Sequence, residues 1–162
     1  MKSKTSQRDT SDIWIFKGLT LGEQGKYEDA IQYSDEALKI NPMNEDAWWL
    51  KGSSLGSLGR YEEAFMCYDK ALKIDPNFES AWCNKAIDLR KMGRYEDAIE
   101  CLDEALKIRP DYVKAWCNKG LALGELGRYE DAVRCIDEAL KINPKDEAVI
   151  SLRKDFLDKL SK

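Results

Sequence analysis

The stretch VKAWCNKGLALGELGRYEDAVRCIDEALKINPKD, residues 113–146, contains the pattern that decides the fold. Its tryptophan, its tyrosine and its proline each recur every 34 residues along the chain. The recurring residues are Trp14, Trp48, Trp82 and Trp116, then Tyr27, Tyr61, Tyr95 and Tyr129, then Pro42, Pro76, Pro110 and Pro144. This spacing predicts four repeat units, 11–44, 45–78, 79–112 and 113–146.

Each unit has the pattern of two helices. In the fourth unit, Trp116, Gly120 and Leu123 lie on one face of a first helix, and Gly127 ends it because glycine adopts left-handed backbone angles without strain. Pro144 ends the second helix. The second helices also carry aspartate and lysine four residues apart, which predicts ion pairs within each helix. These pairs are Asp35–Lys39, Asp69–Lys73, Asp103–Lys107 and Asp137–Lys141.

The repeated pattern W-x3-G-x2-L-x3-G-x-Y-x2-A-x6-A-x4-P resembles the tetratricopeptide repeat. The resemblance implies an all-α fold, a right-handed superhelical α-solenoid of helix-turn-helix repeats, whose first helices line a concave groove for peptides. Two departures occur: lysine replaces the usual leucine before the glycine of the first helix in every unit, and Ala86 replaces that glycine in the third unit. We expect these lysines to lie with their stems along the edge of the core. They are Lys17, Lys51, Lys85 and Lys119.

The segments that flank the repeats differ from them and from each other. Residues 147–162 place Val149, Phe156 and Leu160 among charges, which predicts a C-terminal capping helix. Residues 1–10 show no apolar period and are predicted to be a disordered leader. Within the repeats, we expect Trp82 to be deeply packed.

Composition argues against catalysis. The chain contains no histidine, so the commonest general base and the imidazole metal ligand are missing. The five cysteines stand at equivalent positions of successive repeats, too far apart for disulfides, and they form no zinc-binding pattern. We therefore predict a protein that is not an enzyme and needs no cofactor or metal. Free thiols in this number favour a reducing compartment, the cytoplasm.

Charge and hydropathy also restrict the partners. The net charge is −4, and residues 11–162 hold 23 basic against 29 acidic side chains. Such a surface disfavours binding to nucleic acid. No apolar run is long enough to span a membrane, and the N-terminus lacks the hydrophobic stretch of a secretory signal. The expected partner is a protein or peptide.

The candidate binding residues project from the first helices on the face that lines the groove in this family. The first unit contributes Asp12, Ile15, Phe16, Leu19, Gly22 and Glu23, and the second Asp46, Trp49, Leu50, Ser53, Gly56 and Ser57. The third unit contributes Ser80, Cys83, Asn84, Ile87, Arg90 and Lys91, and the fourth Lys114, Cys117, Asn118, Leu121, Gly124 and Glu125. Their chemistry predicts an extended ligand with an apolar anchor near Trp49 and an acidic segment near Arg90 and Lys114. Packing against a neighbouring helix is the other interpretation of Trp49.

Some members of the family clamp the C-terminal carboxylate of a partner with five basic and amide residues. Asn84 and Lys114 match that clamp, whereas Trp49, Ser53 and Asn118 replace the lysine, asparagine and arginine that it requires. We therefore do not predict this clamp. Two alternatives to peptide binding remain: a structural array that self-associates end to end, and an RNA-binding helical repeat, which the negative charge opposes.

Overall fold

A computed structural model describes the backbone of residues 4–161 and the side chains of residues 10–161. It divides into two compact units, Met1–Ala81 and Trp82–Lys162, called here the N-terminal unit and the C-terminal unit. Residues 4–161 form nine helices and no strand. The prediction of an all-α fold is therefore confirmed. None of these helices is long and apolar enough to cross a membrane.

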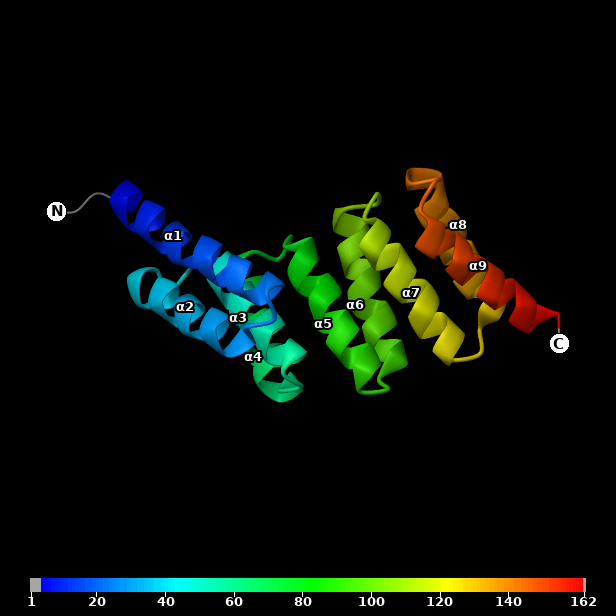
Figure 1. Ribbon diagram of the computed structural model, residues 1–162, viewed down its shortest axis with the longest axis horizontal. Coiled ribbons are helices and arrows are strands. Elements are labelled where there is room, and N and C mark those ends of the chain that lie inside the picture. Colours follow the sequence, from blue (N-terminus) through cyan, green and yellow to red (C-terminus); the bar gives the residue numbers. More distant parts are fainter. Residues whose placement is uncertain (1–3, 162) are drawn as a thin grey trace. The chain divides into compact units, whose positions relative to one another are not determined.

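Paired helices build each unit (Figure 1). The N-terminal unit contains α1 (Lys4–Glu23), α2 (Tyr27–Ile40), α3 (Glu45–Ser57) and α4 (Tyr61–Ile74), and α5 (Glu79–Lys91) begins in it. The C-terminal unit contains the rest of α5, then α6 (Tyr95–Ile108), α7 (Val113–Glu125), α8 (Tyr129–Ile142) and α9 (Glu147–Leu160). Consecutive helices pack on one another, α1 to α4 in the N-terminal unit and α6 to α9 in the C-terminal unit.

Helix α1 begins earlier than the repeat does. It starts at Lys4, so the prediction of a disordered leader over residues 1–10 is corrected for residues 4–10, which are helical. Residues 1–3 lie outside the described part of the chain. The polar sequence of residues 4–10 gave no apolar period, but it contains neither glycine nor proline to interrupt a helix that continues from the repeat.

Glycine makes the turn between the two helices of each repeat, as predicted. Gly25, Gly59, Gly93 and Gly127 have φ angles of 76°, 77°, 77° and 73°. A side chain at these angles would clash with its own backbone. In each turn, the residue after the glycine donates its N–H to a carbonyl near the end of the first helix, as Arg128 does to Leu123 at 2.9 Å. This bond closes the helix and turns the chain.

The core is built mainly from alanine and aliphatic side chains, not from tryptophan. Trp82 is half-buried, as are the tryptophans at the same position of the other repeats, so the expectation of deep packing is wrong. The indole Nε1 of Trp48 donates to the carbonyl of Pro42 at 2.9 Å, and Trp116 bonds Pro110 in the same way at 2.8 Å. Because that carbonyl lies in an exposed turn, one edge of each ring stays near the surface.

The repeated lysine of the first helix binds the aspartate of the preceding second helix. Lys51 Nζ lies 2.6 Å from Asp35 Oδ1, and Lys119 Nζ lies 2.5 Å from Asp103 Oδ1. In α9, arginine takes the lysine position, and Arg153 Nε lies 2.5 Å from Asp137 Oδ1. We call these contacts the inter-repeat ion pairs.

These contacts correct the predicted ion pairs within the second helices. In the structure, Lys39, Lys107 and Lys141 contact the glutamates three residues before them, Glu36, Glu104 and Glu138, at 2.5, 2.5 and 2.6 Å. The hydrogen bond with Glu36 raises the pKa of Lys39. The aspartate one residue before each glutamate lies on the helix face that meets the next repeat. It is therefore positioned to bind across the interface.

Helix α9 covers the last repeat. Its N-terminus is capped by the Asp146 side chain, which accepts hydrogen bonds from the backbone N–H groups of Ala148 and Val149. Val149 and Phe156 are buried in one cluster with residues of α7 and α8. The other side of α9 is in solvent.

Candidate functional site

The predicted groove residues fall into three groups by burial. Ile15 and Leu50 are only 7% and 3% exposed and pack with Ala37, Leu38 and Ala47, so most of each side chain lies in the core. The reason is that successive first helices touch each other through these side chains. Asn84 is also buried. Gly56, Cys83 and Gly124 are buried as well, and the remaining predicted residues are half-buried or exposed: Asp12, Phe16, Leu19, Gly22, Glu23, Asp46, Trp49, Ser53, Ser57, Ser80, Ile87, Arg90, Lys91, Lys114, Cys117, Asn118, Leu121 and Glu125.

A pocket of about 330 Å³ lies between α1 and α3 in the N-terminal unit. We call it the α1–α3 pocket. Its lining residues are Leu19, Gly22, Glu23, Tyr27, Trp49, Leu50, Ser53, Ser54 and Ser57. Seven of these were assigned to the groove face from the sequence. Tyr27 was noted only as a residue of the 34-residue repeat, and Ser54 was not among the predicted residues.

The α1–α3 pocket is open beside Gly22. A Cβ atom added at Gly22 would have no neighbour within 4 Å. The opposite wall consists of the serines of α3, whose hydroxyls bond to their own helix. Ser54 Oγ donates to the carbonyl of Leu50, and Ser57 Oγ to that of Ser53, both at 2.9 Å. Because these donors are already satisfied, the serine wall does not require a polar ligand.

Trp49 forms one side of the α1–α3 pocket and also packs within the unit. Its ring lies 5.8 Å from the ring of Phe78, and it is half-buried. Its Nε1 is buried and makes no hydrogen bond to the described residues. The indole therefore offers the pocket an apolar ring and no accessible donor.

The C-terminal unit has a pocket at the equivalent place, between α7 and α9. It measures about 360 Å³ and is lined by Leu121, Gly124, Glu125, Leu152, Asp155, Phe156, Asp158 and Lys159. Gly124 corresponds to Gly22 three repeats earlier, but a Cβ atom there would lie 2.4 Å from Phe156 Cε1. The ring of Phe156 occupies the space that is open beside Gly22, and charged side chains of α9 surround the rest.

Comparisons with family models cover most of the chain. Models described as tetratricopeptide repeat match residues 17–77, 67–100 and 113–146, and one described as TPR repeat matches residues 88–127. The chain belongs to the tetratricopeptide repeat family.

Solved structures of other tetratricopeptide repeat proteins share this fold. PilF of Pseudomonas aeruginosa is 25% identical, with a TM-score of 0.89 over 96% of this chain and 71% of that one. TTC0263, a thermophilic tetratricopeptide repeat protein of Thermus thermophilus, is 20% identical, with a TM-score of 0.79 over 93% and 82% of the two chains. MamA of Desulfovibrio magneticus RS-1 is 21% identical, with a TM-score of 0.74 over 94% and 92%. No curated protein sequence matches the chain.

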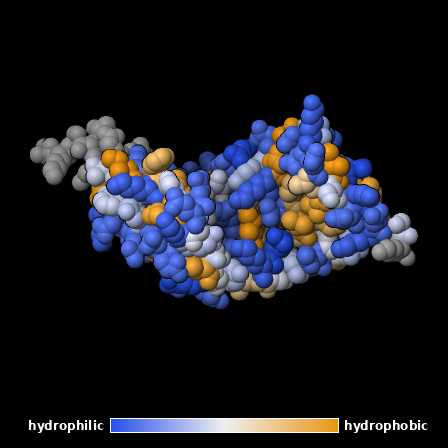
Figure 2. Space-filling model, in the orientation of Figure 1, coloured by the Kyte–Doolittle hydropathy of each residue, from blue (hydrophilic) through white to orange (hydrophobic). Residues whose placement is uncertain are grey.

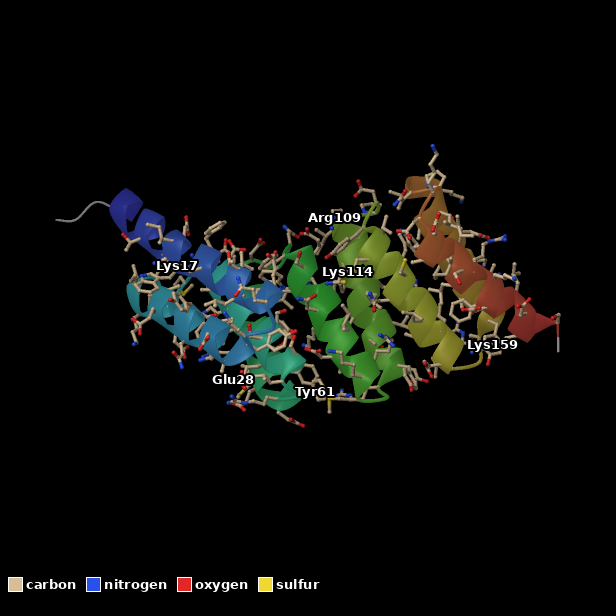
Figure 3. All side chains as sticks on the ribbon, viewed as in Figure 1. Lys17, Glu28, Tyr61, Arg109, Lys114 and Lys159 are labelled. Atoms are coloured by element: carbon tan, nitrogen blue, oxygen red, sulfur yellow. The ribbon has the colours of Figure 1, made fainter. Side chains whose placement is uncertain are left out.

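Tetratricopeptide repeat proteins are, in general, non-catalytic scaffolds for contacts between proteins, and the exposed polar groups of the C-terminal unit suit such a role. Lys114, labelled at the start of α7 in Figure 3, donates from Nζ to Asn84 Oδ1 at 3.0 Å. The Asn118 side chain donates to the carbonyl of Lys114 at 2.8 Å. Lys91 Nζ lies 3.3 Å from Asp88 Oδ1. The structure thus brings together the predicted residues Asn84, Lys114 and Asn118.

The cysteines of this tetratricopeptide repeat protein are all free thiols. Burial raises the pKa of Cys67 and of Cys135 to about 11, and it raises the pKa of Cys117 as well. A thiol with a raised pKa holds little thiolate near neutral pH, and thiolate is the nucleophilic form. The geometry therefore agrees with the interpretation of these residues as packing residues.

Proposed function

We propose that this tetratricopeptide repeat protein is an adaptor that holds a partner polypeptide on the first-helix face, with an apolar side chain of the partner in the α1–α3 pocket. One observation carries the proposal: the pocket is open at Gly22, between the apolar groups of Leu19 and Trp49. Filling such a pocket removes apolar surface of both molecules from water, which stabilises the complex by about 25 cal/mol for each Å² buried.

The shape and polarity of the pocket define the anchor that fits. Its volume of about 330 Å³ accommodates a leucine, methionine or phenylalanine side chain. The serine hydroxyls of α3 already donate to backbone carbonyls, so a polar anchor would gain little there. Glu23 is exposed at the rim. Its carboxylate favours a partner with a basic residue beside the apolar anchor.

The C-terminal unit supports a second, independent contact. Lys114 is exposed on α7, next to Asn84 and Asn118. An ammonium group beside amide groups favours an acidic residue of the partner, as the sequence predicted near Arg90 and Lys114. Such charges contribute mainly to the association rate and to specificity, while the apolar anchor supplies more of the affinity.

A library of random peptides displayed on phage tests the anchor. The selection uses the wild-type chain, and each selected peptide is then measured on Gly22→Leu, whose added side chain fills the pocket. Gln32→Leu, an exposed position of α2, is the matched control because it adds leucine outside the pocket. We expect peptides with a shared large apolar residue, which bind Gln32→Leu normally and Gly22→Leu at least about tenfold more weakly, 1.4 kcal/mol or more.

Equal binding to both variants would place the site elsewhere. A chain whose mass increases with concentration, and whose Gly22→Leu variant stays monomeric, would assign the pocket to self-association. Circular dichroism shows that each variant is folded. For the second contact, Lys114→Glu is expected to weaken the binding of acidic peptides and to reduce the salt dependence of that binding.

A further inference from the structure

The side of α1 that faces away from α2 and α3 carries an unusual surface. Ile13 is 56% exposed and Phe16 is 72% exposed, and Lys17 and Thr20 are exposed beside them. These four residues are spaced as neighbours on one helix face. We call them the α1 end face. Figure 2 shows hydrophobic side chains among hydrophilic ones at the surface of the N-terminal unit, and Figure 3 labels Lys17 on α1.

The equivalent faces of later first helices are interfaces within the chain. In α3, the residues aligned with Ile13, Phe16 and Thr20 are Ala47, Leu50 and Ser54, which are 0%, 3% and 2% exposed. They are covered by the preceding helix pair, since Ala47 and Leu50 pack with Ala37 and Leu38 of α2. In α9, the aligned Val149 and Phe156 are 6% and 4% exposed against α7 and α8. The α1 end face therefore has the position of a repeat interface.

Charge gives the second observation. The residues aligned with Lys17 in α3, α7 and α9 are Lys51, Lys119 and Arg153, and each forms an inter-repeat ion pair with an aspartate of the preceding second helix. Lys17 forms no ion pair with a described residue. Its Nζ lies 5.1 Å from the centroid of the Trp14 ring, a cation–π contact. The α1 end face thus presents the cation of the pair without its aspartate.

We propose that the α1 end face binds an amphipathic helix of another protein, which presents a carboxylate to Lys17 and small apolar side chains to Ile13 and Phe16. The chemistry of this partner follows from the interfaces inside the chain, where α2 offers Asp35, Ala37 and Leu38 to α3. Ile13 is larger than the aligned Ala47. The partner helix therefore carries small residues opposite Ile13, so that the two helices still approach closely.

A second copy of the chain does not fit this role. The carboxylates that could receive Lys17 in the same way are Asp35, Asp103 and Asp137, and all three are held by the next repeat of their own chain. Asp69, the fourth aspartate of the series, also has a partner. Freeing one of them would break a contact of the same kind as the one gained. The exposed cation therefore selects a helix from a different protein.

A helical peptide with the sequence of α2, residues 27–40, is the probe. It carries a fluorophore and a side-chain cross-link between positions 29 and 36, which lie on the side of the helix opposite Leu38, so that the stripe with Asp35 stays available. We expect saturable binding to the full chain by fluorescence anisotropy. Lys17→Glu should weaken the binding about five- to tenfold, because a pair is lost and like charges meet.

Charge exchange separates this site from others. A peptide with D35K should bind the Lys17→Glu chain better than the wild-type chain, which a merely disturbed helix would not produce. Phe16→Ser is expected to weaken the binding of both peptides. Lys154→Glu, on the exposed side of α9, is the control and is expected to leave both affinities unchanged.

Three outcomes would overturn the proposal. The first is no saturable binding to the wild-type chain, and the second is equal affinity of the wild-type and Lys17→Glu chains. The third is binding that responds to Lys51→Glu instead, which would mean that the peptide displaces α2 from its own place. Light scattering adds a further check, since dimers that dissociate on Lys17→Glu would assign the face to a second copy.

Discussion

The N-terminal and C-terminal units repeat the same backbone pattern but present different surfaces at one equivalent place. Between α1 and α3 the space beside Gly22 is open, whereas between α7 and α9 the ring of Phe156 lies against Gly124. The residue aligned with Phe156 in α3 is Ser54. Both places hold a pocket, but the ring of Phe156 forms part of the wall beside Gly124, whereas the space beside Gly22 is open.

The largest expected effect comes from removing the ring of Phe156, which packs against α7 and α8. Phe156 is 4% exposed, so Phe156→Ala should lower the free energy of unfolding of that unit by about 3–5 kcal/mol. Ser54→Ala, its counterpart in the N-terminal unit, should cost less than about 1 kcal/mol, because its hydroxyl only adds a bond to its own helix. Urea unfolding followed by circular dichroism measures both. Equal losses would show that Phe156 does not make the difference between the units.

Alanine substitution of the two aligned glycines, Gly22 and Gly124, should change the free energy of unfolding in opposite directions. Gly124→Ala places a methyl group 2.4 Å from Phe156 Cε1, and we expect it to destabilise by about 1–3 kcal/mol. Gly22→Ala meets open space within a helix and should stabilise by about 1 kcal/mol. Thermal unfolding of the two variants decides this. Combining Gly124→Ala with Phe156→Ala should recover part of the loss, since the clash is then absent.

Charge reversal should lower stability at a cation that forms an ion pair, such as Lys119, and have little effect at Lys17, which forms none with a described residue. Lys119 and Asp103 are 21% and 44% exposed, and Lys119→Glu should destabilise the C-terminal unit by about 1 kcal/mol. Adding Asp103→Lys should restore most of the stability lost, because the two charges are then opposite again. Lys17→Glu should change the stability of the N-terminal unit by less than about 0.5 kcal/mol, because Lys17 forms no pair to lose. A large effect of Lys17→Glu would show instead that Lys17 stabilises α1.

The smallest effect concerns pH, and here the two units should behave alike. Burial raises the pKa of Cys67 in the N-terminal unit and of Cys135 in the C-terminal unit from 9.0 to about 11. Between these values the unfolded chain loses protons that the folded chain retains, so stability is complete below pH 9 and falls as the pH rises toward 11. The melting temperature of Cys67→Ala or Cys135→Ala should fall less steeply between pH 9 and 11 than that of the wild type. Parallel curves would be evidence against the buried thiols.

Periodicity was sufficient to predict the helix pairs, because tryptophan, tyrosine and proline occupy fixed places in each repeat. The inter-repeat ion pairs were missed although their signal was present. Asp35 and Lys51, Asp103 and Lys119, and Asp137 and Arg153 are all 16 residues apart. Helical spacing within one repeat suggested the nearer lysine instead. Only the packing of successive repeats shows that these aspartates face away from it.

The candidate site was predictable in outline and not in detail. The first-helix face identified Leu19, Gly22 and Trp49 correctly as neighbours of one pocket. It also included Ile15, which is buried among Ala37, Leu38 and Ala47 and does not line that pocket. The periodic pattern gives the direction of a side chain from its own helix. It does not give the distance to the next helix, which depends on the sizes of all the residues between them.

The inter-repeat ion pairs have a consequence for how such a chain can change length. Because each first helix brings a cation and each second helix brings an aspartate at the same place, the junctions are chemically interchangeable. Deleting residues 45–112, two whole repeats, would bring Lys119 to the position that Lys51 holds opposite Asp35. Recombination between equivalent codons would therefore lengthen or shorten the array while each new junction keeps a matched pair of charges. The number of repeats can therefore change without new substitutions at the interfaces between them.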